Sequence, residues 1–323
     1  MENNSRHEYL NFVEEQFEKC FSDKGYIQEI PVPITSKVDP STAFVGSTIS
    51  PMKPYLLDNN IGKKGRFLIQ NCMRTQVLKG LKDREPRTFG SCFKGMGILT
   101  EPDLDKVVYD TFDYLTNPNY LNIPLENLRI RINSQDEDLL RAIEQVDSGI
   151  IREIDTYPER LYRHKYGMEE QGITGRNFNV GVRKKDTDTF YDIGNIIVME
   201  DEKKKHAIEM GFGNCTFSMS KFGVDNTVAS SRMADVMPID SIESMKMGDA
   251  MNVVATLQYE DVQNHPKFSR YFKGLFKKYN DVIAHWQGEL SMSDRQILEN
   301  MEKYIALEYG KEIKGENTWT REQ

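Results

Sequence analysis

The chain has 323 residues, 28% of them charged, and a formal net charge of −8. This charge argues against a broad, nonspecific nucleic-acid surface, and no apolar run approaches the length of a membrane span. The four cysteines form no Cys-x-x-Cys pair and the first twenty residues lack the apolar centre of a signal peptide, so we expect a cytoplasmic protein with reduced thiols and no membrane contact.

The first third of the chain predicts a helix, an edge strand and a hairpin. Helical spacing of apolar residues predicts a helix over 6–24, which Gly25 ends. Residues 26–33 predict a short strand whose two prolines suit the edge of a sheet. A turn-rich loop over 39–57 leads into a strand, a basic loop and a second strand over 67–99.

The rest of the chain predicts mixed elements and then helices. In order, these are a helix over 103–115, a strand over 128–132, a helix over 136–145, a glycine-rich loop over 166–176, strands over 177–183, 189–200 and 206–219, and helices over 241–257, 265–283 and 294–307. Because polar turns join the strands, we expect an antiparallel sheet. We predict an α+β fold, with an antiparallel β-sheet flanked by helices in a domain over 1–236 and a helical C-terminal domain over 237–323.

Arg74 is the first candidate functional residue. It ends the buried strand of the 67–99 segment, so its planar guanidinium is held rigidly and suits a phosphate or a carboxylate. The basic loop that follows could fold over a polyanionic ligand. The alternative is an ordinary hairpin with a solvated tip, and this segment alone leaves both open.

Five landmarks occur in order along the chain. They are the segment DPSTAFVGSTISPMKPYLL with Asp39, Pro40, Phe44, Lys53 and Pro54; Cys72-Met73-Arg74; the strand-to-helix element over 128–142 with Asp136-Glu137-Asp138; the strand from Asn195 to Glu200; and Gly211-Phe212-Gly213. Together they resemble the catalytic core of class II aminoacyl-tRNA synthetases, and their detail is most similar to the alanyl-tRNA synthetase family. The resemblance covers roughly residues 6–220.

The resemblance implies a sheet that binds ATP and an amino acid and forms an aminoacyl-adenylate. Arg74 would be the catalytic residue, contacting the α-phosphate where charge develops, and the loop over 75–88 would cover ATP. The implied ATP-binding residues are Arg74, Lys82, Arg84, Phe93, Lys94 and Gly213; the implied substrate-binding residues are Gly194, Asn195, Glu209 and Gly211. Mg²⁺ would bridge the phosphates, with no metal ligand assigned to the chain itself. The first helix and the proline-containing strand correspond to a motif that often forms a dimer interface, so a homodimer is one expectation.

Three departures from the family pattern bear on the activity. Thr216 stands where the family has the arginine that holds the γ-phosphate, and a threonine cannot replace a bidentate cation. Either Lys94, Arg183 or Arg232 supplies the charge from elsewhere, or the protein no longer activates with ATP in the standard way. Gly194 stands where the family has a tryptophan, which predicts a larger or more polar substrate than alanine unless the register is shifted by one. Glu209 replaces an aspartate that holds the substrate ammonium, and its charge is retained.

These features leave several functions open. The first is an ATP-dependent ligase that transfers an activated amino acid to a tRNA, a carrier protein or a small amine. We expect a stand-alone, truncated paralogue without editing and recognition domains, in a specialised pathway rather than routine translation. The second is a catalytically inactive paralogue that acts as a regulatory or ligand-binding subunit, which Thr216 favours. The third, a tRNA-binding module without chemistry, is disfavoured by the acidic charge, although the Lys/Tyr-rich helix over 265–283 could face RNA or be an ordinary surface helix.

Overall fold

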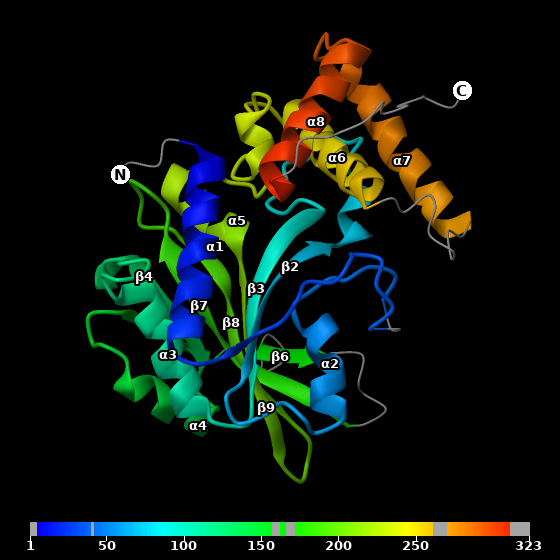
Figure 1. Cartoon of the computed structure of the whole chain (residues 1–323). Coiled ribbons are helices and arrows are strands. Elements are labelled where there is room, and N and C mark those ends of the chain that lie inside the picture. Colours follow the sequence, from blue (N-terminus) through cyan, green and yellow to red (C-terminus); the bar gives the residue numbers. More distant parts are fainter. Residues whose placement is uncertain (1–4, 40–41, 157–161, 166–171, 261–269, 311–323) are drawn as a thin grey trace. The chain divides into compact units, whose positions relative to one another are not determined.

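The computed structural model describes residues 5–39, 42–156, 162–165, 172–260 and 270–310 (Figure 1). Contacts between residues divide the chain into two compact units. The helical unit comprises Met1–Leu10, Met73–Phe93 and Val224–Gln323, and the sheet unit comprises Asn11–Cys72 and Lys94–Gly223. The division into domains over 1–236 and 237–323 remains a prediction.

The strands form a mixed sheet in the order β1-β2-β3-β9-β8-β7-β4-β5, with β6 paired to β7. Their bounds are β1 Ile27–Gln28, β2 Arg66–Met73, β3 Cys92–Thr100, β4 Leu128–Asn133, β5 Ile151–Asp155, β6 Arg163–Lys165, β7 Thr174–Arg183, β8 Phe190–Glu200 and β9 Lys205–Gly213. The pairs from β3 through β9, β8 and β7 to β4 are antiparallel, which confirms the predicted α+β fold. The pairs β1–β2 and β4–β5 are parallel, because a connection that contains a helix joins each of them.

The helices that lie wholly or mostly in the sheet unit flank this sheet, and those of the helical unit pack on one another. The former are α1 Arg6–Asp23, α2 Ile49–Leu57, α3 Leu104–Thr116, α4 Glu137–Ala142 and α5 Asn214–Phe222, and the latter are α6 Ile242–Tyr259, α7 Arg270–Gln287 and α8 Asp294–Tyr309. Helices α7 and α8 both contact α6 (Figure 1). Ser241 and Ser293 begin α6 and α8 with capping boxes, which satisfy backbone donors that the first turn leaves free.

One face of the sheet packs on helices through aromatic side chains. Phe17 of α1 lies 5.5 Å from Tyr114 of α3 between ring centroids, and 6.0 Å from Phe67 of β2. Phe212 of β9 lies 5.8 Å from Phe217 of α5. These rings are buried, and offset or edge-on pairs at such distances add to the free energy of burial. This face is therefore the main core of the sheet unit.

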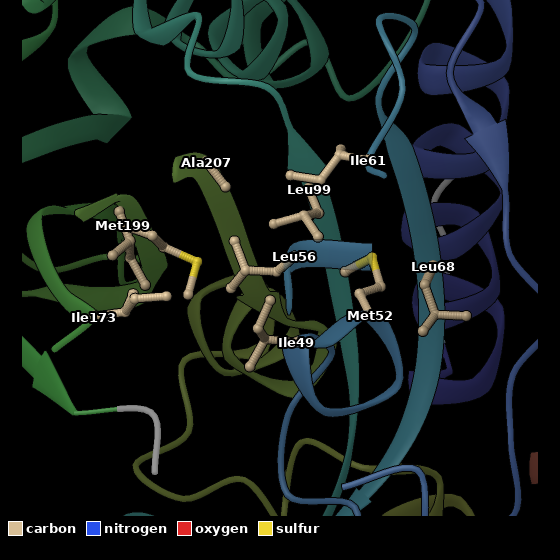
Figure 2. Close-up of a cluster of buried hydrophobic side chains, with 10 residues drawn as sticks. Ile49, Met52, Leu56, Ile61, Leu68, Leu99, Ile173, Met199 and Ala207 are labelled. Carbon is tan, nitrogen blue, oxygen red and sulfur yellow. The ribbon is translucent and has the colours of Figure 1, made fainter. Parts of the chain in front are cut away.

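The other face of the sheet is apolar only at one end. There α2 contributes Ile49, Met52 and Leu56, which pack with Leu99 of β3 and with other buried residues, namely Ile61, Leu68, Ile173, Ile197, Met199 and Ala207 (Figure 2). Strand side chains alternate between the two faces. The same strands therefore present different residues to α2 and to the aromatic core.

Several sequence-based boundaries were wrong. The loop expected over 39–57 contains α2, which the two prolines in its sequence concealed: Pro51 lies in the first turn, where no backbone donor is needed, although Pro54 lies inside the helix. The strand expected over 206–219 ends at Gly213, and α5 follows. Strand β5 was missed, and β7 begins at Thr174, inside the expected loop over 166–176. Residues 40–41 and 166–171, which include Pro40 of the first landmark, lie outside the described residues.

A bulge in β8 fixes the conformation of Gly194. The register between β7 and β8 shifts beside this residue, whose φ is +156°. A Cβ atom there would lie 1.9 Å from the carbonyl oxygen of Gly211, so any side chain would force the backbone to move. The structure thus supplies a backbone reason for glycine at a position where the sequence comparison expects a tryptophan. The enlarged substrate pocket inferred from Gly194 stays a prediction.

The bulge predicts different costs for two glycine substitutions in neighbouring strands. Gly194→Ala should lower the free energy of unfolding by more than about 2 kcal/mol, because of the clash and the backbone strain. Gly211→Ala is the matched control: its nearest neighbour would be 3.7 Å away, so the loss should stay below about 1 kcal/mol. Chemical denaturation measures both, and equal stability of the two variants would contradict the assigned role of Gly194.

Candidate active site

A row of small and polar residues crosses the face of the sheet opposite the aromatic core. Register pairs join Gly97 of β3 to Gly211 of β9, Gly211 to Asn195 of β8, Asn195 to Asn179 of β7, and Asn179 to Arg131 of β4. Residues paired across strands share one face. The row therefore places two side-chain-free positions beside three hydrogen-bonding side chains, and it brings together the predicted residues Asn195 and Gly211.

Glu209 lies in the next row, with its carboxylate near Gly211. It is 4% exposed, and a Cβ atom on Gly211 would lie 3.7 Å from its Oε1 and 4.0 Å from Oγ1 of Thr48. Thr48 also fills the space above Gly97, where a Cβ atom would meet its Oγ1 at 2.1 Å. The Thr48 hydroxyl makes no cap hydrogen bond to α2. A buried carboxylate and a hydroxyl beside two glycines form a polar cluster whose chemistry suits an ammonium group.

Two asparagines of β7 continue this polar surface. Asn177 Nδ2 donates to Asn179 Oδ1 at 3.0 Å. Asn177 is 1% exposed, and within the described parts of the chain its Oδ1 accepts no hydrogen bond. A buried acceptor left unpaired is costly, so such groups usually have a function. Sequence reasoning missed both residues and Thr48; the i, i+2 spacing of the asparagines within a strand was the available signal.

The far end of this face carries ion pairs. Arg129 Nη2 of β4 lies 2.7 Å from an oxygen of Asp192, and Arg131 Nε lies 3.0 Å from an oxygen of Glu153. Arg129 is almost fully buried, and its guanidinium carbon also lies 5.2 Å from the centroid of the Phe190 ring. These pairs fix β4 and β5 side chains beside Asn179, so the polar row ends in paired charges.

Thr216 lies in the first turn of α5, just after Gly213. Its hydroxyl donates to the Gly213 carbonyl at 2.6 Å, and the residue is buried. The side chain thus stabilises the start of the helix and offers no charge to a ligand.

The three cations considered as replacements for the missing arginine all have acidic partners. Lys94 pairs with Glu14 of α1 at 3.0 Å, Arg183 pairs with Asp188 at 2.6 Å, and, within the helical unit, Arg232 pairs with Glu308 at 3.2 Å. Lys94 also alternates with Gly95 along β3, so its side chain points to the face that carries the aromatic core. ATP binding by Lys94 stays a prediction that this orientation does not favour.

Within the helical unit, the structure brings Arg74 and Phe93 together. The guanidinium carbon of Arg74 lies 4.9 Å from the centroid of the Phe93 ring, within the range of a cation–π contact. The Arg74 side chain is exposed, and its backbone N–H donates to the Ser91 carbonyl at 2.8 Å. The two residues that the resemblance assigns to the α-phosphate and to adenine are therefore neighbours.

The basic loop between them is anchored to α6 and α7. Lys246 of α6, which is fully buried, donates to the Gly80 carbonyl at 2.8 Å and pairs with Asp83. Trp286 Nε1 of α7 donates to the Leu81 carbonyl at 2.7 Å. Two residues of this loop are predicted to bind ATP. Arg84 pairs with Glu243 and Glu289, and Lys82 is exposed. Closure of the loop over ATP remains a prediction.

Two further landmarks have partners in the sheet unit. Asp39 and Lys53 form a buried ion pair at 2.6 Å. Asp136 accepts from Arg163 at 3.1 Å and from Arg176 at 3.2 Å. These contacts give the landmarks a structural role.

Within the described ranges, no group of three His, Cys, Asp or Glu side chains is arranged to hold a metal ion. No helix in the same residues combines the length and apolarity needed to cross a membrane.

Curated proteins provide the comparison that bears on the family. No family model matches the chain. Alanine–tRNA ligase of Borrelia hermsii is 26% identical over 187 residues, which are 57% of this chain and 30% of that protein. The enzyme of Treponema denticola is 23% identical over 190 residues, or 58% and 29% of the two chains. This chain is similar to alanyl-tRNA synthetases. The predicted resemblance is thus confirmed at modest identity, and the aligned part spans about 30% of the length of these relatives.

Solved structures that align with the chain are class II aminoacyl-tRNA synthetases. Histidyl-tRNA synthetase of S. aureus aligns with a TM-score of 0.42 and 11% identity, covering 84% of this chain and 82% of that one. Aspartyl-tRNA synthetase of Entamoeba histolytica aligns with a TM-score of 0.40 and 9% identity, covering 69% and 56%. Scores at this level add no argument about the site.

The contacts of Lys246 predict how the basic loop responds when this lysine of α6 is replaced. Lys246→Met removes the donor to Gly80 and Asp83, so the free energy of unfolding should fall by about 1–3 kcal/mol and amide exchange at Gly80 and Leu81 should accelerate. Lys278→Met, which changes an exposed lysine of α7, is the control and should change neither. Hydrogen exchange measured by mass spectrometry tests this, and unchanged exchange in Lys246→Met would show that the loop is held by other contacts.

Proposed function

We propose that this protein is an ATP-dependent ligase that activates an amino acid as its aminoacyl-adenylate. The observation that carries the proposal is the buried polar cluster of Glu209 and Thr48 beside Gly97 and Gly211 on the polar face of the sheet. The similarity to alanyl-tRNA synthetases supports the same chemistry.

In the proposed reaction, the chain binds and orients its substrates and supplies no covalent nucleophile. The Glu209 carboxylate binds the substrate ammonium, and Asn195 lies beside it on the same face. The carboxylate of the amino acid attacks the α-phosphorus of ATP, and pyrophosphate leaves. Arg74 stabilises the negative charge that builds up on the α-phosphate, while Phe93 packs against the base. Mg²⁺ would enter with the phosphates of ATP, because no protein ligand for it is assigned.

The polar face favours a substrate that can form hydrogen bonds. Asn177 offers a buried acceptor without a partner in the described residues, and Asn179 lies next to it. A substrate side chain that donates an N–H or O–H would satisfy this acceptor, whereas the methyl group of alanine would not. The proposed substrate is therefore a polar amino acid.

The acceptor of the activated amino acid would be a tRNA, a carrier protein or a small amine, in a specialised cytoplasmic pathway. The protein would act as a homodimer.

A second candidate function is a regulatory or ligand-binding subunit without catalysis. It is favoured by Thr216, which is committed to the start of α5, and by the acidic partners of Lys94, Arg183 and Arg232. Loss of a charged contact to a phosphate removes roughly 1.5–3 kcal/mol. ATP turnover distinguishes the two functions.

Pyrophosphate exchange tests the proposed reaction. Wild-type protein with ATP, Mg²⁺ and a panel of amino acids, including nonproteinogenic ones, should exchange labelled pyrophosphate into ATP with one polar amino acid. Arg74→Ala should lower this exchange at least about 100-fold while circular dichroism is unchanged, because the removed contact acts on the transition state. Exchange at the wild-type rate in Arg74→Ala would remove this residue from the mechanism, and silence across the panel would favour the regulatory subunit.

A substitution at Glu209 separates binding of the amino acid from binding of ATP. Glu209→Gln keeps the size of the side chain and removes its charge, so KM for the amino acid should rise at least about tenfold, as expected for a lost charged hydrogen bond. KM for ATP should change less than about threefold, because the carboxylate binds only the ammonium. Glu202→Gln, at an exposed glutamate between β8 and β9, is the control. Equal effects on both KM values would argue against an ammonium site at Glu209.

A further inference from the structure

A buried hydrogen-bonded cluster joins Ser91 to α6 and α7 of the helical unit. Asp249 of α6 accepts from the Ser91 backbone N–H at 2.6 Å and from the Ser91 hydroxyl at 2.8 Å. The Ser91 Oγ also lies 3.0 Å from the Tyr279 hydroxyl of α7. Ser91 and Tyr279 are 0% exposed and Asp249 is 2% exposed. The backbone N–H and the hydroxyl of Ser91 are thus both fixed by helices that lie far away in the sequence.

The same serine is bonded to the candidate catalytic arginine. Its carbonyl accepts the backbone N–H of Arg74 at 2.8 Å, and Phe93, which packs on the Arg74 guanidinium, follows two residues later. Asp249 is therefore linked to Arg74 through one residue: two hydrogen bonds join Asp249 to Ser91, and one joins Ser91 to Arg74. Asp249 itself touches no residue assigned to a ligand.

The neighbouring backbone shows how closely this contact is fitted. A Cβ atom on Gly90 would lie 2.9 Å from Asp249 Oδ1 and 2.8 Å from a methyl carbon of Val228. The Gly90 N–H donates to the Thr227 hydroxyl at 2.7 Å. The segment before β3 is therefore held from two sides, and a larger residue at Gly90 would push it away from α6.

We propose that Asp249 is a positioning residue that fixes the end of the strand carrying Arg74 through Ser91. This inference rests on the proposed function for its effect on catalysis. A transition-state contact is effective only when its donor is held in place before the reaction, and an exposed arginine side chain on a loosely held strand end would lose that advantage. The C-terminal helices thereby contribute to the candidate reaction without contacting a substrate.

The electrostatic surroundings indicate which substitution can replace Asp249. Burial raises the pKa of Asp249 to about 6, against the hydrogen bonds from Ser91 and the nearby charge of Arg87. The other titratable groups that interact with it, Tyr279 and Cys92, both have pKa values raised by burial and are neutral. An asparagine keeps an acceptor for the Ser91 N–H and can donate to the Ser91 hydroxyl. Asp249→Asn should therefore preserve the contact, whereas Asp249→Ala removes it.

The test measures the Arg74 amide and the reaction in the same variants of the full chain. In Asp249→Ala, exchange of the Arg74 and Ser91 amides with deuterium should accelerate at least about tenfold relative to wild type. In pyrophosphate exchange, kcat should fall at least about tenfold while KM for the amino acid changes less than about threefold. Asp249→Asn should restore both quantities to within about threefold of wild type.

Controls separate positioning from general destabilisation. Asn252→Ala truncates another buried polar residue of α6, whose side-chain oxygen accepts from Thr256 in the same helix, and should leave the Arg74 amide protected. If Asp249→Ala does not fold, Ser91→Ala replaces it: the variant loses the hydroxyl contact and keeps the backbone one, and kcat should still fall at least about threefold.

The outcomes for the inference and for the reaction are distinguishable. Unchanged Arg74 protection and unchanged kcat in Asp249→Ala would overturn the inference, as would an equal loss of kcat in Asp249→Asn. Accelerated amide exchange in Asp249→Ala, together with no pyrophosphate exchange by wild type, would leave the contact to Arg74 established and contradict the proposed reaction.

Discussion

The register of the central antiparallel strands is the constraint on which the candidate site depends. Pairing across β3, β9, β8 and β7 sends the aromatic residues to the helices and lines up glycines and asparagines on the opposite face. A slip of one residue in any of these strands would exchange its two faces, and a slip of β9 would turn Glu209 into the aromatic core. The bulge at Gly194 pins this register, because only glycine can follow the backbone there.

Each of the two units holds its candidate residues by different means. In the sheet unit, backbone pairing positions Glu209, Asn195 and the two glycines, so the site is built on rigid elements. In the helical unit, side chains of α6 and α7 hold an irregular segment: Lys246 and Trp286 bind its carbonyl groups, and Asp249 binds Ser91. Buried charged and polar groups of this kind are costly unless every partner is present.

The sequence predicted the fold better than the site, for physical reasons. Strands β2, β3 and β8 and most helices follow apolar periodicity and were found, whereas α2 was concealed by prolines and α5 by the strand that precedes it. Arg74 was identified from its place at the end of a buried strand, and Phe93, Glu209 and Gly211 came from a motif resemblance that is local in the chain. Lys246 and Asp249 were missed because helix α6 is buried nearly all round, so its polar positions gave no amphipathic signal, and their partners lie more than 150 residues away.

The most direct test of the proposed chemistry follows an oxygen atom. The protein is incubated with ATP, Mg²⁺, hydroxylamine as acceptor and an amino acid that supports pyrophosphate exchange. The carboxylate of this amino acid carries ¹⁸O. If the carboxylate attacks the α-phosphorus and hydroxylamine then attacks the carbonyl carbon, mass spectrometry will find one ¹⁸O in the released AMP. Label in inorganic phosphate together with ADP, or no labelled product with any amino acid, would contradict adenylate formation by this protein.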